Sequence, residues 1–95
     1  MYVVVRTYAG GGAKQLFDIL DERKAEVEAV LRTVPGLVNY TLGRSAEGGV
    51  SITVCSDKAG ADESVRVARD WVQKNASGAS ANPPQLSEGT VIVHI

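Results

Sequence analysis

The chain has 95 residues, of which ten are basic, eleven are acidic, one is His and one is Cys. A chain of this length builds one modest core, so we expect residues 1–95 to form a single domain. The balanced charge offers no basic surface for a nucleic acid or an anionic membrane. The single Cys and single His exclude a disulfide framework and a metal site built from several such ligands.

The first residues carry no targeting signal. Only the four apolar residues from Tyr2 to Val5 separate Met1 from Arg6, whereas a secretory signal needs about 7–15 apolar residues. No apolar run approaches the roughly 18 residues of a membrane span. We therefore expect a cytoplasmic protein that does not enter a membrane.

The first half of the chain predicts a strand followed by a long helix. Residues 2–8 (YVVVRTY) are β-branched and aromatic, which favours a strand, and the glycine run 10–12 ends it. Across residues 13–33 apolar side chains recur at helical spacing with charges on the opposite side, which indicates one two-sided helix. The dipeptide Pro35-Gly36 ends this helix.

The middle of the chain predicts a β-hairpin. Residues 37–44 (LVNYTLGR) form its first strand and residues 50–56 (VSITVCS) alternate as its second. The short glycine-containing turn at residues 45–49 brings the two strands together as antiparallel neighbours.

The last third predicts a helix, a long loop and a final strand. Ser56 or Asp57 can cap a helix over residues 59–75. Residues 76–89 are rich in Ser, Ala, Gly and Pro and read as a loop, and residues 90–95 alternate as a strand. The complete order β-α-β-β-α-β predicts a ferredoxin-like α+β fold, an antiparallel four-stranded sheet with two helices on one face.

The second face of this sheet carries an unusual composition. In the last three strands one row is apolar and is expected to face the helices: Val38, Tyr40, Leu42, Val50, Ile52, Val54, Val91, Val93 and Ile95. The alternate row contains no acid and no Lys: Leu37, Asn39, Thr41, Ser51, Thr53, Cys55, Ile92 and His94. A face against water should carry charges. We therefore expect a second copy to cover it, giving a homodimer with two sheets packed face to face.

The stretch from Pro35 to Arg44, together with the element order, the hairpin and the uncharged sheet face, resembles the dimeric α+β barrel superfamily. Within it, the chain is most similar to the antibiotic biosynthesis monooxygenase-like family, over nearly its whole length. The resemblance implies a homodimer with a pocket between the helices and the sheet of each subunit. Some members oxidise aromatic polyketides without a cofactor, some degrade haem, and others have no known activity. The haem-degrading members carry an axial His on the second helix, and residues 59–75 contain none.

Five side chains are candidates for lining such a pocket: Arg6, Tyr8, Tyr40, Trp71 and His94. Arg6 shares a strand row with Tyr8 and can hold a carboxylate or enolate ligand, or pair with an acid across a dimer. Trp71 lies on the flank of the stripe formed by Ala61, Val65, Ala68 and Val72, where it walls a pocket or packs against a partner chain. The imidazole of His94 suits acid–base chemistry, but we favour a structural or surface role for it. We likewise favour a core role for Tyr40.

Three other features give no site. Cys55 has no neighbouring cation in sequence to activate its thiol, so we expect it to be inert. The glycine run 10–12 lacks the dinucleotide fingerprint, because Gln15 stands where the third glycine belongs, and it reads as a flexible loop. The strand at residues 50–56 has no aromatic on which an RNA base could stack.

The sequence identifies no catalytic residue and predicts neither a metal nor a cofactor. Our principal hypothesis is a small homodimer that binds an apolar or aromatic ligand, with cofactor-free oxidation as its reaction. The alternative is a non-catalytic dimeric module for metabolite sensing or assembly.

Overall fold

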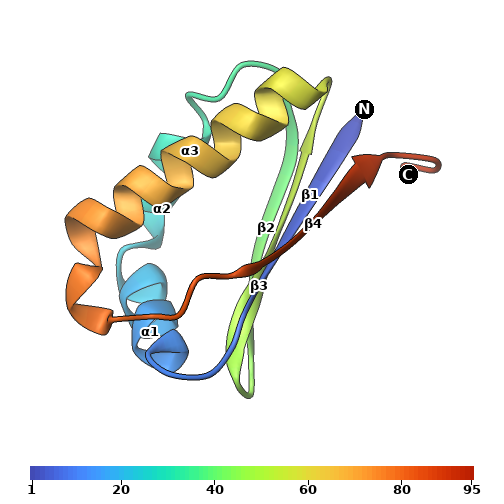
Figure 1. Ribbon diagram of the computed structural model, residues 1–95. Helices are drawn as coiled ribbons and strands as arrows, with labels where there is room; N and C mark the ends of the chain where they lie inside the picture. Colours follow the sequence, from blue (N-terminus) through green and yellow to red (C-terminus); the bar gives the residue numbers. More distant parts are fainter.

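The computed structural model describes residues 1–95 and has the predicted ferredoxin-like α+β fold. Its strands pair antiparallel in the order β2-β3-β1-β4, and the helices cover one face of this sheet (Figure 1). The elements are β1 (Tyr2–Tyr8), α1 (Ala13–Glu22), α2 (Lys24–Leu31), β2 (Leu37–Ser45), β3 (Gly48–Cys55), α3 (Lys58–Asn75), the 3₁₀ turn η1 (Ser77–Ala79) and β4 (Gln85–Thr90).

The helix predicted over residues 13–33 is divided into α1 and α2. Arg23 lies between them with a non-helical backbone (φ −112°, ψ 29°). The apolar stripe is interrupted here, because Arg23 and Lys24 occupy the two positions one helical turn after Leu20 where an apolar residue would continue it toward Val27. Without an apolar contact to hold a straight helix on the sheet, the chain turns here and starts a new helix.

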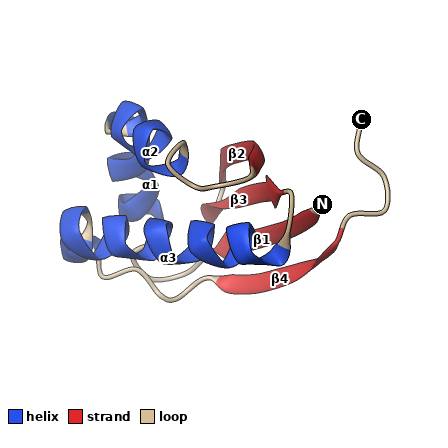
Figure 2. Ribbon diagram, turned by 90° about the horizontal axis from the view of Figure 1, so that it is seen from above, coloured by secondary structure: helices blue, strands red, loops and turns tan.

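The final strand lies earlier in the chain than predicted. β4 pairs with β1 from Gln85 opposite Thr7 to Thr90 opposite Tyr2, so residues 85–89 belong to a strand and not to the predicted loop. Beyond Val91, whose N–H donates to the carbonyl of Met1 (3.0 Å), β1 offers no further backbone. The alternating residues 92–95 therefore leave the sheet as an exposed tail, in which Ile92 is 96% exposed (Figure 2).

The two faces of β3 are the reverse of the prediction. Ser51, Thr53 and Cys55, which are at most 1% exposed, lie beneath the helices. The apolar row Val50, Ile52 and Val54 therefore points to the opposite face. In β2, Tyr40 and Leu42 do face the helices, as predicted, and an irregularity between Leu37 and Asn39 displaces Val38.

The face of the sheet opposite the helices, called here the open face, contains no charged residue. The strand registers place twelve residues on it: Val3, Val5, Thr7, Asn39, Thr41, Gly43, Val50, Ile52, Val54, Gln85, Ser87 and Gly89. Valines and one isoleucine occupy its centre, and no element of the chain packs over it (Figure 1). The expectation of an uncharged face holds, with more apolar residues on it than the sequence suggested.

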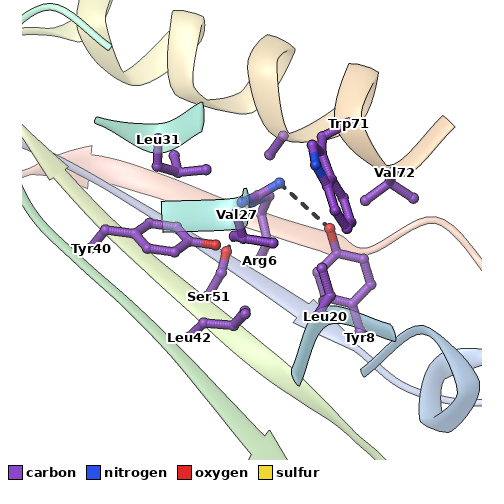
Figure 3. Close-up of a pocket in the computed structure, with 11 residues that line it drawn as sticks. Arg6, Tyr8, Leu20, Val27, Leu31, Tyr40, Leu42, Ser51, Trp71 and Val72 are labelled. Atoms are coloured by element: carbon purple, nitrogen blue, oxygen red, sulfur yellow. Dashed lines mark hydrogen bonds between the residues drawn. The ribbon is translucent and has the colours of Figure 1, made fainter. Parts of the chain in front are cut away.

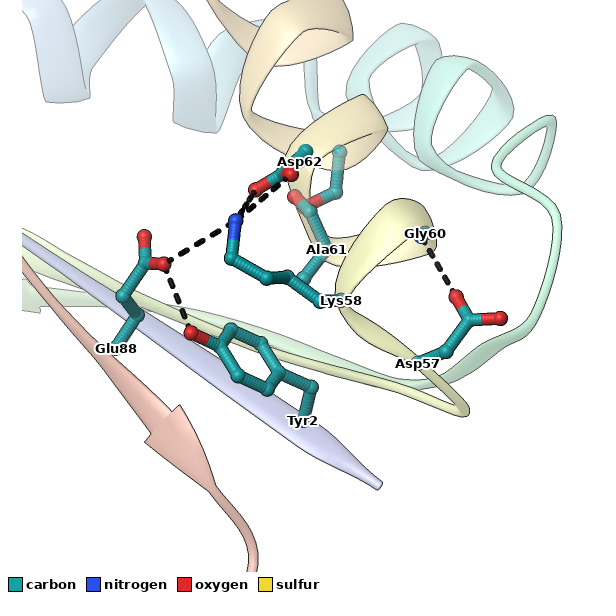
Figure 4. A network of polar contacts seen from close by, with 8 residues as sticks. Tyr2, Asp57, Lys58, Gly60, Ala61, Asp62 and Glu88 are labelled. Atoms are coloured by element: carbon teal, nitrogen blue, oxygen red, sulfur yellow. Dashed lines mark hydrogen bonds and ion pairs between the residues drawn. The ribbon is translucent and has the colours of Figure 1, made fainter.

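A polar network fastens the start of α3 to the edge of the sheet (Figure 4). Asp57 caps the helix by accepting a hydrogen bond from the N–H of Gly60 (2.9 Å), as one of the two predicted caps. Lys58 pairs with Asp62 (3.0 Å) and reaches toward Glu88 on β4 (3.9 Å). Tyr2 donates to the same Glu88 carboxylate (2.9 Å), so helix, central strand and edge strand share one set of contacts.

Candidate functional site

Arg6 is a buried cation without an acidic partner. β1 directs its side chain beneath the helices, where the residue is 4% exposed. Its Nε donates to Oγ of Ser51 on the adjacent strand (3.0 Å), and Nη1 makes a long contact to Oη of Tyr8 (3.5 Å). None of the ion pairs in the chain includes Arg6. A buried charge that lacks a counter-charge is costly.

The guanidinium borders an interior cavity of about 20 Å³, which has room for about one water molecule. Figure 3 shows the hydroxyl of Tyr40 pointing toward Ser51 and Arg6 across this space. Burial raises the pKa of Tyr40, and the charge of Arg6 opposes part of that rise, so the phenol stays protonated at neutral pH. The other walls are apolar: Leu20, Val27, Leu31, Leu42, Ala68, Trp71 and Val72.

Trp71 lies on the buried face of α3 and not on its flank, which corrects the helical-wheel prediction. The buried line of the helix runs through Gly60, Ala61, Ser64, Ala68 and Trp71, and Trp71 is 8% exposed. The other four residues are small, so the helix lies close to the sheet. The indole of Trp71 fills the remaining space between α3 and the sheet. The Arg23 guanidinium lies 5.2 Å from the centre of the ring and also donates to Asn75 (3.0 Å). Arg23 thereby holds the indole in place.

A groove of about 470 Å³ opens beside the cavity, between α3, residues 81–84 and the edge of the sheet. Arg6, Tyr8 and Val72 line both spaces and form the boundary between them. The groove is lined further by apolar and polar residues, none of them acidic: Leu16, Val65, Arg69, Gln73, Ala81, Asn82, Pro83, Pro84 and Leu86. A second groove of about 510 Å³ runs along α2 and β2 and shares Tyr40 with the cavity.

The structure thus brings four of the five predicted residues around one cavity: Arg6, Tyr8, Tyr40 and Trp71. His94 is not among them, because it lies in the exposed tail after β4. Sequence reasoning missed Ser51, Arg69 and Asn82. The position of Arg69, one helical turn from Val65 and Gln73, was a usable signal for it.

The glycine run has a packing role in place of the flexible loop that was predicted. A side chain at Gly12, which has φ +80°, would collide with the carbonyls of Ala79 and Ser80. The N–H of Asn82 also donates to the carbonyl of Gly11 (3.1 Å). The glycines therefore let residues 79–82 lie close against the start of α1, and this contact positions one wall of the groove.

Three further observations limit what the chain can do. No three His, Cys, Asp or Glu side chains gather closely enough to hold a metal ion. Cys55 is fully buried, and its burial raises the pKa of the thiol. None of the helices combines the length and the apolar character needed to span a bilayer.

Comparison with known proteins identifies the fold. No protein-family model matches the chain, and no curated protein matches its sequence. Among solved structures, a monooxygenase from the ActVA-Orf6 gene of Streptomyces coelicolor, in complex with nanaomycin D, aligns with a TM-score of 0.62 and 19% identity, covering 99% of this chain and 88% of that one. The chain shares the ferredoxin-like α+β fold of this monooxygenase.

Two other structures share this fold. A protein of unknown function from Nitrosomonas europaea, NE2512, has a TM-score of 0.71 and 17% identity, covering 99% of this chain and 90% of that one. A variant of MhuD with two manganese protoporphyrin IX molecules in each active site has a TM-score of 0.68 and 16% identity, covering 99% and 96% of the two chains. At identities this low, the alignments show a shared fold and nothing more.

Proposed function

We propose that this protein is a small homodimer that binds an apolar or aromatic ligand between its helices and its sheet. The observation that carries the proposal is the buried cluster of Arg6, Tyr8, Tyr40 and Ser51 beside Trp71, at the inner end of an otherwise largely apolar groove. The groove volume of about 470 Å³ falls in the range of small-molecule sites. The organic ligands held by MhuD and by the ActVA-Orf6 monooxygenase support the proposal.

The ligand must displace side chains to reach the interior. The cavity of about 20 Å³ holds no more than a water molecule, whereas the groove can accept a bicyclic ring. A ring that enters the groove meets Arg6 and Tyr8 first, because these residues form the boundary with the cavity. Binding should therefore perturb the nearby indole of Trp71, the only tryptophan in the chain.

The proposed reaction is the cofactor-free oxidation of an electron-rich aromatic. In such a reaction the substrate itself supplies the electrons that reduce dioxygen, and the protein supplies a site shielded from water. Arg6 would stabilise the phenolate or enolate form of the substrate, from which electrons leave most readily. Oxygen-electrode traces with a panel of hydroquinones test this step. Uptake should exceed the protein-free rate and fall with Arg6→Met, and uptake equal to that of buffer would contradict it.

Homodimerisation is proposed from the open face. Twelve neighbouring positions without a charge, with Ile52 36% exposed among them, form a surface that a second sheet can cover. Light scattering after size exclusion should give twice the mass of one chain. Ile52→Lys should shift the mass to that of a monomer, whereas Val38→Lys, at a more exposed valine outside this face, should not. A monomeric wild-type protein at micromolar concentration would refute the dimer.

The alternative is a non-catalytic dimeric module for metabolite sensing or assembly. The small size of the interior cavity favours it, because a reacting ring would need more space beside Arg6 than about 20 Å³. A ligand that binds stoichiometrically and is recovered unchanged after incubation in air would identify a sensor. Dimerisation without any ligand binding would identify an assembly module.

A further inference from the structure

We infer that the ligand carries a carboxylate, which Arg6 receives at the inner end of the groove while Arg69 attracts it at the rim. This inference rests on the proposed function, because it names the chemical class of the ligand for the same site. It follows from the distribution of charge in the chain, from the donors left free at Arg6 and from the apolar walls between the two arginines.

Half of the unpaired cations of the chain line this groove. Six of the ten basic residues take part in ion pairs, and the four that do not are Arg6, Lys14, Arg69 and Lys74. Two of these four line the groove, and no Asp or Glu does. A chain with a net charge of −1 thus presents a purely cationic set of charges at one place, and such a site selects an anion.

Arg6 retains the donors that a carboxylate needs. A guanidinium has five N–H donors, and Ser51 and Tyr8 receive two of them. Tyr8 accepts from Arg6 and still has its own O–H to donate. The remaining N–H groups and this hydroxyl can meet both oxygens of one carboxylate, a geometry in which arginine is especially effective.

The walls of the groove define the rest of the ligand. Leu16, Val65 and Val72 lie on one part of the lining, and Pro83, Pro84 and Leu86 lie on another. These residues offer contact but no hydrogen bond to the body of a ligand. The structure therefore points to an acid with an apolar, ring-containing body, and an uncharged molecule of the same shape should leave Arg6 without a counter-charge.

Isothermal titration calorimetry with a matched pair of probes tests the inference. Naphthalene-2-carboxylate should bind the wild-type protein at least about tenfold more tightly than naphthalene-2-carboxamide, because hydrogen bonds to charged groups are stronger. Arg69→Gln should weaken carboxylate binding several-fold and leave amide binding unchanged. Lys74→Gln, which removes an unpaired charge of the same helix outside the groove, should leave both unchanged.

The outcomes separate this inference from the proposed function. Equal affinities for the carboxylate and the amide would overturn the inference and leave an apolar ligand site standing. An equal loss with Lys74→Gln and Arg69→Gln would also overturn it, because general charge would then explain the preference. If neither probe nor any larger neutral aromatic binds, the proposed function itself fails. Arg6→Met should abolish the preference for the carboxylate.

Discussion

Replacing Arg6 with Met should make the ligand-free protein more stable. The substitution keeps a long, flexible side chain in the space beneath the helices but removes a charge that is 4% exposed and has no acidic partner. A buried ion costs several kcal/mol of lost hydration. The substitution also removes the hydrogen bond to Ser51 (3.0 Å) and the contact to Tyr8 (3.5 Å), and the loss of these interactions opposes the gain in stability.

The magnitude follows from these two contributions. The hydrogen bond from the charged guanidinium is worth about 1.5–3 kcal/mol, and the lost hydration of several kcal/mol exceeds it, so the net gain should be about 1–2 kcal/mol. In a domain of this size, each kcal/mol corresponds to a rise of about 4–8 °C in melting temperature. Arg66→Met is the control, because Arg66 is exposed and paired with Glu63 and Asp70, and its removal should change the melting temperature little.

Thermal and urea unfolding of the two variants, followed by circular dichroism, checks the argument. A melting temperature above that of the wild type, together with binding of naphthalene-2-carboxylate no tighter than that of the amide, would show that the chain keeps Arg6 for its ligand. A loss of more than about 1 kcal/mol in Arg6→Met would refute the reasoning. It would mean that the contacts of the guanidinium with Ser51 and Tyr8 outweigh its lost hydration.

Three further predictions concern stability and reactivity. Thr53→Val should stabilise the protein by about 1–2 kcal/mol in urea unfolding, because Oγ1 of this fully buried residue has no hydrogen-bond partner; a destabilised variant would reveal a partner. Cys55 should react with a thiol reagent only after denaturant is added, because burial both shields it and raises its pKa; prompt labelling of the native protein would contradict this. Arg66 lowers the pKa of Glu63 below its ordinary 4.5 in the folded state. The stability that Glu63 contributes is therefore present above about pH 4.5 and lost as the pH falls through the folded pKa. In Glu63→Gln the free energy of unfolding should fall less with decreasing pH in that range, and a pH profile equal to that of the wild type would contradict this.

The periodicity of the sequence predicted most of the fold, because each element is amphipathic in its own register. Arg6 and Tyr8 were placed together correctly, since alternate residues of a strand share a face. Tyr40 reaches the same space from β2. Alternation predicted that Arg6 and Tyr8 share a row, and the packing of the helices decides which face that row takes.

The face of β3 could not be predicted from its own residues. The side chains on either face of β3 can be buried in a core. The packing of the neighbouring elements determines which face of the strand lies beneath the helices. Tyr40, Trp71 and Arg6 already occupy the volume beneath the helices, so β3 contributes the small Ser51 there, and Arg6 requires its hydroxyl. The larger Ile52 is left for the open face. The choice therefore depends on tertiary packing.

The position of β4 depends on where its partner strand ends. Residues 91–95 alternate more regularly than residues 85–90, but β1 begins at Tyr2 and has no backbone left to pair with them. Arg69 and Asn82 escaped notice for a similar reason. Both residues line the groove because the glycine run lets the segment before β4 approach α1, which no pattern within that segment reveals. Within α3, only the helical spacing of Arg69 with Val65 and Gln73 was a signal.

The most direct test of the account uses the single tryptophan. A protein labelled with ¹⁵N has one indole N–H resonance, that of Trp71, which lines the cavity beside Arg6. Titration with naphthalene-2-carboxylate should shift this resonance with the dissociation constant measured by calorimetry, and in Arg6→Met the shift should require the higher concentrations at which the amide binds. An indole resonance that stays fixed while the ligand binds would place the site elsewhere and contradict the account.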